Sequence, residues 1–141
     1  MDAKPVEGSS FYFVGLPART WPEVDLTNAA RLHEQVAEWI KAGAVLAAHD
    51  CGNDGILPTL AEMAFAGQCG VNAAFDFKNP FDPIPVGYVL QAKSAIESSA
   101  SIVIERIGEV STSPCLSWKG SDAFACALDE LCNAWRAPLA W

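Results

Sequence analysis

One stretch of this sequence constrains the fold more than any other, because an apolar run, a polar turn and a helix pattern follow one another without interruption. Residues 44–48 are all apolar, residues 49–55 are polar or glycine apart from Cys51, and residues 56–66 are again mainly apolar. A short apolar run bounded by turn residues indicates a buried strand. Pro58 is compatible with the first turn of a helix, where no N–H donor is needed. We therefore expect a strand, a turn and a helix that packs back on a sheet.

The residues before this unit predict a first strand and a first helix. Residues 11–14 are β-prone, whereas residues 1–10 are mainly polar and are expected to form a flexible lead-in. From residue 26 to residue 40, apolar side chains recur at helical spacing. Asp25 or Thr27 can cap this helix. One face of the helix must be buried, most simply against a sheet.

The residues after the unit predict further strands and a last helix. Apolar and β-branched residues dominate four segments, 71–75, 86–92, 102–110 and 115–119. Residues 94–101 are ambiguous, and a short helix is one interpretation of them. Between residues 121 and 137, apolar residues stand at helical spacing before Pro138, which predicts a C-terminal helix over 121–137; they are Phe124, Leu128, Leu131 and Trp135.

Strands and helices in this order predict a mixed sheet with helices packed on it, and therefore an α+β fold. The 141 residues suit a single domain spanning 1–141, and we detect no internal repeat and no linker long enough to divide it. Hydrophobic residues make up 51 % of the chain and charged residues 18 %, which is typical of a globular rather than a disordered chain.

Charge and cysteine content exclude several classes of protein. The formal net charge is −8 and no basic cluster is present, which argues against a nucleic-acid-binding surface. No apolar run reaches the roughly 18 residues that span a bilayer, and residues 1–7 have no signal-peptide h-region. The five cysteines form no CxxC pair, and with two histidines they offer no zinc-ligand set. We therefore expect a cytoplasmic protein with reduced thiols and no membrane contact.

Residues 47–75 carry a specific resemblance. His49-Asp50, Gly55, the run LAEMAFAG at residues 60–67 and Cys69-Gly70 match in register a stretch of the phosphoribosylformylglycinamidine synthases that reads roughly AHDxSDGGLxxxLAEMAFAGxCG. Shorter matches lie on both sides, at residues 8–12, 24–26, 106–110 and 128–135. Over nearly its whole length the chain therefore resembles the last lobe of that enzyme, its C-terminal AIR-synthase-related domain.

The resemblance implies a three-layer α/β/α lobe with a mixed sheet, like the C-terminal domain of aminoimidazole-ribonucleotide synthase and partly ferredoxin-like. The whole synthase is an ATP-dependent C–N ligase of purine biosynthesis that converts formylglycinamide ribonucleotide into the amidine with glutamine-derived ammonia. In the family the catalytic histidine and most substrate contacts lie in other lobes, so this chain is expected to contain no catalytic residue and to be inactive alone. The implied partners are the remaining lobes and the glutaminase component.

The resemblance also implies a nucleotide site at the turn. In the large form of the synthase this loop contributes to an auxiliary nucleotide site, and the residue matching Asp50 is a magnesium ligand. A strand end that leads into a helix N-terminus offers N–H groups and a helix dipole to phosphate. Asp50 is thus the candidate Mg²⁺ ligand, and the candidate phosphate loop consists of Gly52, Asn53, Asp54 and Gly55.

The loop departs from the family pattern at three positions. The family serine is Gly52, the following aspartate is Asn53, and the first glycine is Asp54. A nucleotide-contacting hydroxyl is lost, and a carboxylate stands where phosphate would approach. We therefore expect a degenerate site, with Mg²⁺ and ATP or ADP serving the full enzyme and none of them bound to this chain.

A structural role is the alternative for the same loop. Asp50 and Asn53 would then cap the second helix, and the glycines at 52 and 55 would supply a turn with positive φ. His49 and Cys51 are two residues apart, which by itself is not the geometry of a nucleophile and its base. Within the second helix, Glu62 is expected to form a salt bridge rather than to act as a base.

Two further alternatives concern the chain as a whole. One is a degenerate stand-alone domain that binds a protein partner or a small ligand without catalysis. The other is a homodimer of the isolated lobe, because an excised lobe would expose an apolar face. The candidates for that face are Phe11, Phe13, Trp21 and Trp141. His33 is expected to be exposed on the first helix.

Overall fold

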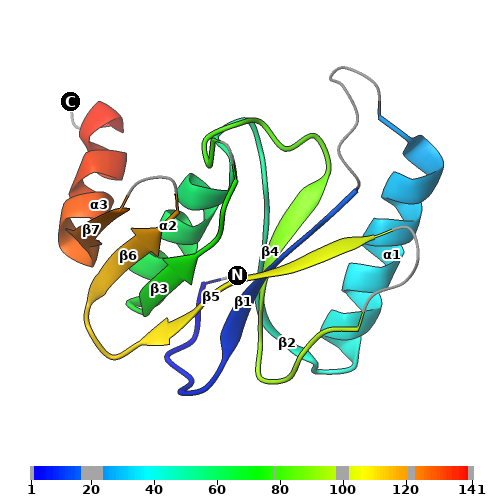
Figure 1. Ribbon diagram of the computed structural model, residues 1–141, viewed down its shortest axis with the longest axis horizontal. Coiled ribbons are helices and arrows are strands. Elements are labelled where there is room, and N and C mark those ends of the chain that lie inside the picture. Colours follow the sequence, from blue (N-terminus) through cyan, green and yellow to red (C-terminus); the bar gives the residue numbers. More distant parts are fainter. Residues whose placement is uncertain (1, 17–23, 78, 98–101, 121–122, 140–141) are drawn as a thin grey trace.

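The computed structural model describes residues 2–16, 24–77, 79–97, 102–120 and 123–139. Within these residues seven strands form one sheet, in the order β2-β4-β1-β5-β3-β6-β7, and three helices accompany it (Figure 1). The strands are β1 (Ser10–Gly15), β2 (Val45–Asp50), β3 (Gly70–Ala74), β4 (Gly87–Ala92), β5 (Val103–Ser111), β6 (Cys115–Lys119) and β7 (Ala123–Ala127). The helices are α1 (Leu26–Lys41), α2 (Ile56–Gly67) and α3 (Leu128–Arg136), and a 3₁₀ turn follows at Ala137–Leu139.

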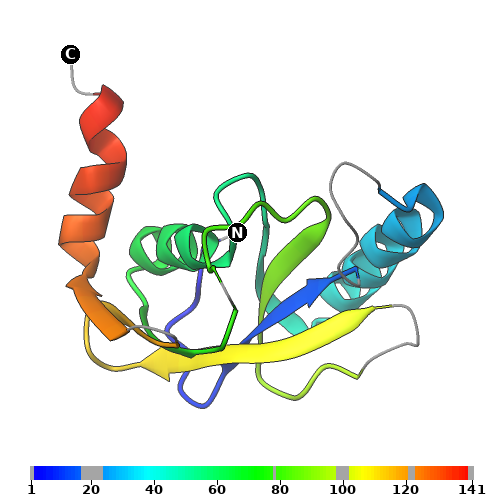
Figure 2. The ribbon, with the colours of Figure 1, turned by 45° about the horizontal axis from the view of Figure 1, so that its top comes forward.

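Helices cover both faces of the sheet. Successive side chains of a strand point to opposite faces, and in β1 Phe11 and Phe13 pack with α2 while Tyr12 and Val14 pack with α1. The β3–β6 pair is parallel and the other neighbouring pairs are antiparallel, so the sheet is mixed. The expected α+β fold with three α/β/α layers is confirmed. In Figure 2, α3 stands beyond the end of the β6–β7 hairpin.

Helix α1 is amphipathic and has a well-formed start. Its N-cap is Asp25, whose carboxylate accepts a hydrogen bond from the Asn28 N–H at 3.1 Å. Leu32 and Val36 are buried against the sheet, and each buried side chain of this kind contributes roughly 1.5–3 kcal/mol. The opposite side of the helix faces solvent, which confirms the predicted helix and its single apolar face.

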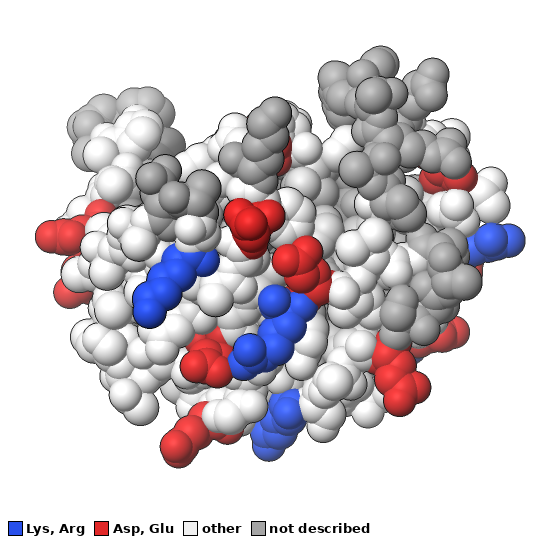
Figure 3. Space-filling view, in the orientation of Figure 1, with Lys and Arg blue, Asp and Glu red and all other residues white. Residues whose placement is uncertain are grey.

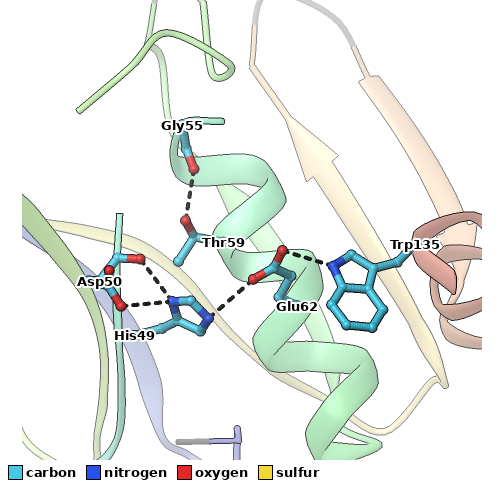
Figure 4. A network of polar contacts seen from close by, with 6 residues as sticks. All are labelled: His49, Asp50, Gly55, Thr59, Glu62 and Trp135. Carbon is cyan, nitrogen blue, oxygen red and sulfur yellow. Dashed lines mark hydrogen bonds and ion pairs between the residues drawn. The ribbon is translucent and has the colours of Figure 1, made fainter. Parts of the chain in front are cut away.

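Helix α2 is buried on most of its sides. Its buried residues include Ile56, Leu60, Met63 and Ala64, which lie in the larger of the two core clusters. A helix that is apolar around most of its circumference needs neighbours on several sides. Here the sheet lies on one side and α3 on another, and the polar residue Glu62 points toward α3 (Figure 4).

The N-terminal residues are packed onto the domain, so the predicted flexible lead-in is wrong for residues 2–10. Ala3 is 1 % exposed and its N–H donates to the Met63 carbonyl at 3.1 Å. Buried Gln91 accepts from the Lys4 N–H at 2.7 Å and donates to the Lys4 carbonyl at 2.6 Å and to Ser9 Oγ at 2.8 Å. These hydrogen bonds satisfy a buried amide that would otherwise be costly, and they hold the segment in place.

The C-terminal helix is shorter than predicted. The residues Ala123–Ala127 form strand β7, so the predicted helix over 121–137 is wrong at its start and holds from Leu128. Pairing with β7 covers an edge of β6 that would otherwise carry unpaired backbone groups. The four-residue spacing of Phe124 and Leu128 suits a helix and led to the wrong prediction. Phe124 lies in β7 instead, where its ring packs against Trp118 at a centroid distance of 6.1 Å.

Two other expectations are corrected here. Phe11 and Phe13 are 0 % and 5 % exposed, so they cannot form an exposed apolar face, and Trp21 and Trp141 lie outside the described residues. Residues 94–97 form no helix, and residues 98–101 lie outside the described part of the chain.

On the α1 side of the sheet, β5, β3 and β6 present polar residues. Arg106 pairs with Glu109 at 2.8 Å and donates to Ser10 Oγ, while Ser117 Oγ donates to Asn72 Oδ1 at 2.8 Å. The face of the molecule in Figure 3 shows Lys and Arg scattered among Asp and Glu. No basic patch gathers on this face, in keeping with the acidic composition.

Candidate functional site

The turn between β2 and α2 is shaped by one glycine. Asp50 is the last residue of β2, and α2 starts after Gly55, whose φ of 86° lies in the region that favours glycine. Gly55 is the N-cap and no side chain caps the helix, so the predicted capping by Asp50 and Asn53 is wrong. The prediction of a positive φ holds at Gly55 but not at Gly52.

The start of α2 is closed by a second loop. The Leu57 N–H donates to the Pro80 carbonyl at 3.2 Å, and the Ile84 N–H donates to the Gly52 carbonyl at 3.1 Å. Pro58 has no N–H, and the Thr59 hydroxyl and N–H both point to the Gly55 carbonyl. The Thr59 N–H makes the first hydrogen bond of the helix itself, and of the donors before it that a phosphate would need, Leu57 is engaged and Pro58 has none.

His49 belongs to a polar network that joins β2, α2 and α3 (Figure 4). Its Nε2 lies 3.2 Å from Glu62 Oε2, and its Nδ1 lies 2.8 Å from the Asp50 carbonyl oxygen. The other Glu62 oxygen accepts from the Trp135 Nε1–H at 3.1 Å. Glu62 is thus a structural link between elements, as the sequence predicted, and the sequence did not identify Trp135 as its partner.

Cys51 is unsuited to nucleophilic catalysis. The side chain is buried, and this burial is the main cause that raises the pKa of its thiol to about 12. A thiol with this pKa is protonated at neutral pH, and the thiolate is the nucleophilic form. With His49 held by Glu62, the two residues do not form a nucleophile and base pair.

A cavity of about 310 Å³ lies on the other side of the β2 end, against α1. From α1 it is lined by His33, Val36 and Ile40 among others, and from the strands by His49, Asp50 and Tyr88 among others. His33 Nδ1 lies 2.6 Å from the Tyr88 hydroxyl oxygen, and the two rings meet edge to face. The pKa of the Tyr88 hydroxyl is raised, first by its burial and second by the negative charge of Asp50, which lies nearby.

The predicted site residues differ in their exposure to solvent. Asp50 has a side chain that is 82 % exposed, whereas Gly55 is buried under the 80–84 loop. Among the described residues, no group of three or more His, Cys, Asp or Glu side chains is placed to hold a metal ion. The same residues contain no helix long and apolar enough to cross a bilayer. A metal role for Asp50 stays a prediction.

The family is settled by residues that include this turn. A model of the family described as AIR synthase related protein, C-terminal domain, matches residues 9–101. The chain belongs to this family. The match covers β1 to β4, both of the helices that flank the β2 end and all the candidate site residues, Asp50 and 52–55.

Curated relatives carry the name phosphoribosylformylglycinamidine synthase subunit PurL. The protein of Novosphingobium aromaticivorans is 36 % identical over 89 residues, which are 63 % of this chain and 11 % of that protein. That of Sinorhizobium medicae is 33 % identical over 105 residues, 67 % of this chain and 14 % of the relative. This chain therefore corresponds to a small part of the relatives that it matches.

Solved structures show the same fold. A Thermotoga maritima PurLQS structure has a TM-score of 0.73 at 16 % identity, and the match covers 92 % of this chain and 27 % of that chain. T. maritima PurL complexed with ATP has a TM-score of 0.69 at 16 % identity, with the same coverage. A chain of a HypE–HypF complex is more distant, at a TM-score of 0.55 and 13 % identity. The fold thus extends over β5 to α3, beyond the family match.

Proposed function

We propose that this chain is the C-terminal lobe of a phosphoribosylformylglycinamidine synthase, and that it supports the ATP-dependent conversion of formylglycinamide ribonucleotide to the amidine without carrying the chemistry itself. The observation behind the proposal is the family match over residues 9–101, together with relatives that are named PurL. The lobe contributes a folded surface to the assembled enzyme, and the reaction belongs to de novo purine biosynthesis.

The covered start of α2 favours a structural rather than a catalytic role for this chain. The Leu57 N–H donates to the Pro80 carbonyl and Pro58 has no N–H, so these two residues of the first turn offer phosphate no donor. Asp54 adds a carboxylate beside the same helix start, where the dipole would otherwise favour phosphate. We infer that ATP, ADP and Mg²⁺ serve the other lobes of the full enzyme, and that Asp50 holds no Mg²⁺ in this chain alone.

The proposed partners are the remaining lobes of the synthase and its glutaminase component. One of the similar structures is of a PurLQS assembly, in which PurL occurs with further components. The present chain covers 27 % of the chain that it matches in that structure. The lobes that complete the enzyme would therefore be formed by sequence other than these 141 residues. We place the reaction in the cytoplasm.

A complementation assay tests this proposal. The purified protein is supplied with formylglycinamide ribonucleotide, ATP, Mg²⁺ and ammonia, first alone and then mixed with a PurL variant that lacks the equivalent lobe. We expect no amidine from either component and amidine formation from the mixture. Turnover by the chain alone would overturn its supporting role, and a mixture that neither associates nor turns over would overturn its place in the synthase.

The second candidate is a degenerate stand-alone domain that binds a partner or a small ligand. The specific observation in its favour is the departure of the loop from the family pattern at 52–54, combined with the closure of the helix start by the 80–84 loop. Under this alternative, the lobe-deleted synthase would not recruit the protein, and gel filtration of the mixture would show two separate species.

A further inference from the structure

We propose that the cavity between α1 and the end of β2 binds a small organic cation, an amine with a short apolar body. The site is independent of the proposed role in the synthase. It is lined by His33, His49, Asp50 and Tyr88 on its polar side and by residues that include Val36 and Ile40 on its apolar side. Two elements distant in sequence, α1 and the β2–β4 pair, create it together.

The charge of the cavity selects for a cation. Asp50 is the acidic residue among the described residues that line it, and none of those residues is Lys or Arg. The nearest partner of its carboxylate in the network is His49 Nδ1 at 3.6 Å, but the same nitrogen lies closer, at 2.8 Å, to the Asp50 carbonyl. The carboxylate is therefore weakly compensated, and an ammonium group would pair with it more closely. A phosphate or carboxylate ligand would be repelled.

The Tyr88–His33 pair provides a second polar contact. At 2.6 Å, the Tyr88 hydroxyl donates to His33 Nδ1 when the imidazole carries its proton on Nε2. The lone pairs of the phenol oxygen then remain as acceptors for an ammonium N–H. Residue pairing in the sheet sets Asp50 opposite Tyr88, and the Asp50 carboxylate is near enough for its charge to act on the phenol.

The remaining wall suits a short apolar body. Ile40 is 39 % exposed although it is large and apolar, and it lines the cavity together with Val36. A volume of about 310 Å³ is at the lower end of the range of small-molecule sites, roughly 300–1,000 Å³. One ring or a short alkyl chain fills such a space.

Benzylamine is a suitable probe, with benzoate and benzyl alcohol as matched probes of opposite and zero charge. Binding is followed by ¹H–¹⁵N NMR titration of the protein at pH 7, where benzylamine is protonated. We expect saturable shifts at His33, Ile40, Asp50 and Tyr88 with benzylamine. Benzoate and benzyl alcohol should bind at least about tenfold more weakly, since each lacks the charge-assisted contact.

Two matched variants locate the site. Asp50→Asn should weaken benzylamine binding about threefold, because solvent screens an exposed carboxylate, whereas Asp54→Asn, which removes a carboxylate that does not line the cavity, should leave binding unchanged within the error of the titration. Asp50 has an exposed side chain, so its variant should fold normally; Tyr88→Phe provides a second test, with an expected loss of several-fold. Absence of saturable benzylamine binding, equal binding of benzoate, or equal effects of Asp50→Asn and Asp54→Asn would each overturn the proposal.

Discussion

His49 and Asp50 are consecutive residues at the end of β2, but they lie in different surroundings. His49 contacts Glu62 of α2, and Glu62 in turn contacts Trp135 of α3 (Figure 4). Asp50 lines a cavity against α1, with a side chain that is 82 % exposed. The family resemblance places both residues in one motif, yet the pleat of the strand turns the His49 side chain toward α2 and the Asp50 side chain toward α1, although His49 also contributes to the lining of the cavity.

The difference comes from the two helices. Helix α2 is apolar on most of its sides, and its start is covered by the loop that contains Pro80, so side chains on that side have structural partners. Helix α1 buries one face and leaves Ile40 partly exposed beside the cavity. We conclude that the α2 side is closed around the end of β2, whereas the α1 side, although it buries Leu32 and Val36, leaves space beside Asp50.

The strongest test of this comparison is a pair of alanine variants. Leu60 of α2 is 0 % exposed, and Leu60→Ala should lower the free energy of unfolding by about 2–5 kcal/mol because it removes buried methyl groups and leaves a cavity. Ile40→Ala on the α1 side should cost less than about 1.5 kcal/mol, since Ile40 is 39 % exposed. Urea denaturation measures both. Equal losses would contradict the division into a closed and an open side.

A pair of glycine variants tests the turn. In Gly55→Ala the new Cβ would lie 2.5 Å from the Pro80 carbonyl oxygen at a φ of 86°, so we expect a loss of at least about 1–3 kcal/mol. A Cβ at Gly52 would meet open space, and the φ of Gly52 is not positive, so Gly52→Ala should change stability by less than about 0.5 kcal/mol. Thermal melting of the two variants gives the comparison. A tolerated alanine at 55 would show that the loop does not close on the helix start.

Because of the buried Cys51 thiol, we expect the free energy of unfolding to depend on pH. Its pKa is raised from 9.0 to about 12, so the folded state keeps a proton that the unfolded chain releases above pH 9. The stabilisation is fully present below pH 9 and is lost between about pH 9 and 12, by roughly 1.4 kcal/mol per pH unit. Urea denaturation between pH 8 and 10.5 should show this slope in the wild type. Cys51→Ala should reduce the slope of stability against pH. An unchanged slope in that variant would show that other groups cause the pH dependence.

The smallest expected effect concerns the Glu62 link. Glu62 and His49 have side chains that are 35 % and 33 % exposed, so solvent screens the polar contact between them. Glu62→Gln should cost less than about 1 kcal/mol, and Asp50→Asn on the open side should cost still less. Chemical denaturation of both variants, at low and at high salt, checks the ranking. A larger loss of stability for Asp50→Asn than for Glu62→Gln would contradict the structural role given to Glu62.

Sequence patterns predicted the elements better than their contacts. The spacing of Leu32 and Val36 predicted α1, and the apolar run at 44–48 predicted β2, because these signals are local. Strand β7 was missed because Phe124 and Leu128 also fit a helical spacing, and only pairing with β6 decides between the two. The predicted caps of α2 were wrong for a similar reason. The loop with Pro80 takes the place of a capping side chain, and its position depends on the tertiary fold.

The candidate site shows the same limit. The motif directed attention to Asp50 and to residues 52–55, but not to Tyr88 or His33. Tyr88 lies opposite Asp50 only because β4 pairs with β2, and His33 reaches it from α1 at 2.6 Å. No spacing in the chain carries that information. The resemblance therefore predicted the domain, and the geometry was needed to separate its structural residues from those available to a ligand.

In this chain the start of α2 acts as a structural turn rather than as a phosphate site. Isothermal titration of the purified protein with ADP in the presence of Mg²⁺ distinguishes the two roles. We expect no saturable heat and no change in Tm, because the helix start is covered and Asp54 opposes phosphate. Saturable, Mg²⁺-dependent ADP binding that is lost in Gly55→Ala or Asp50→Asn would contradict it.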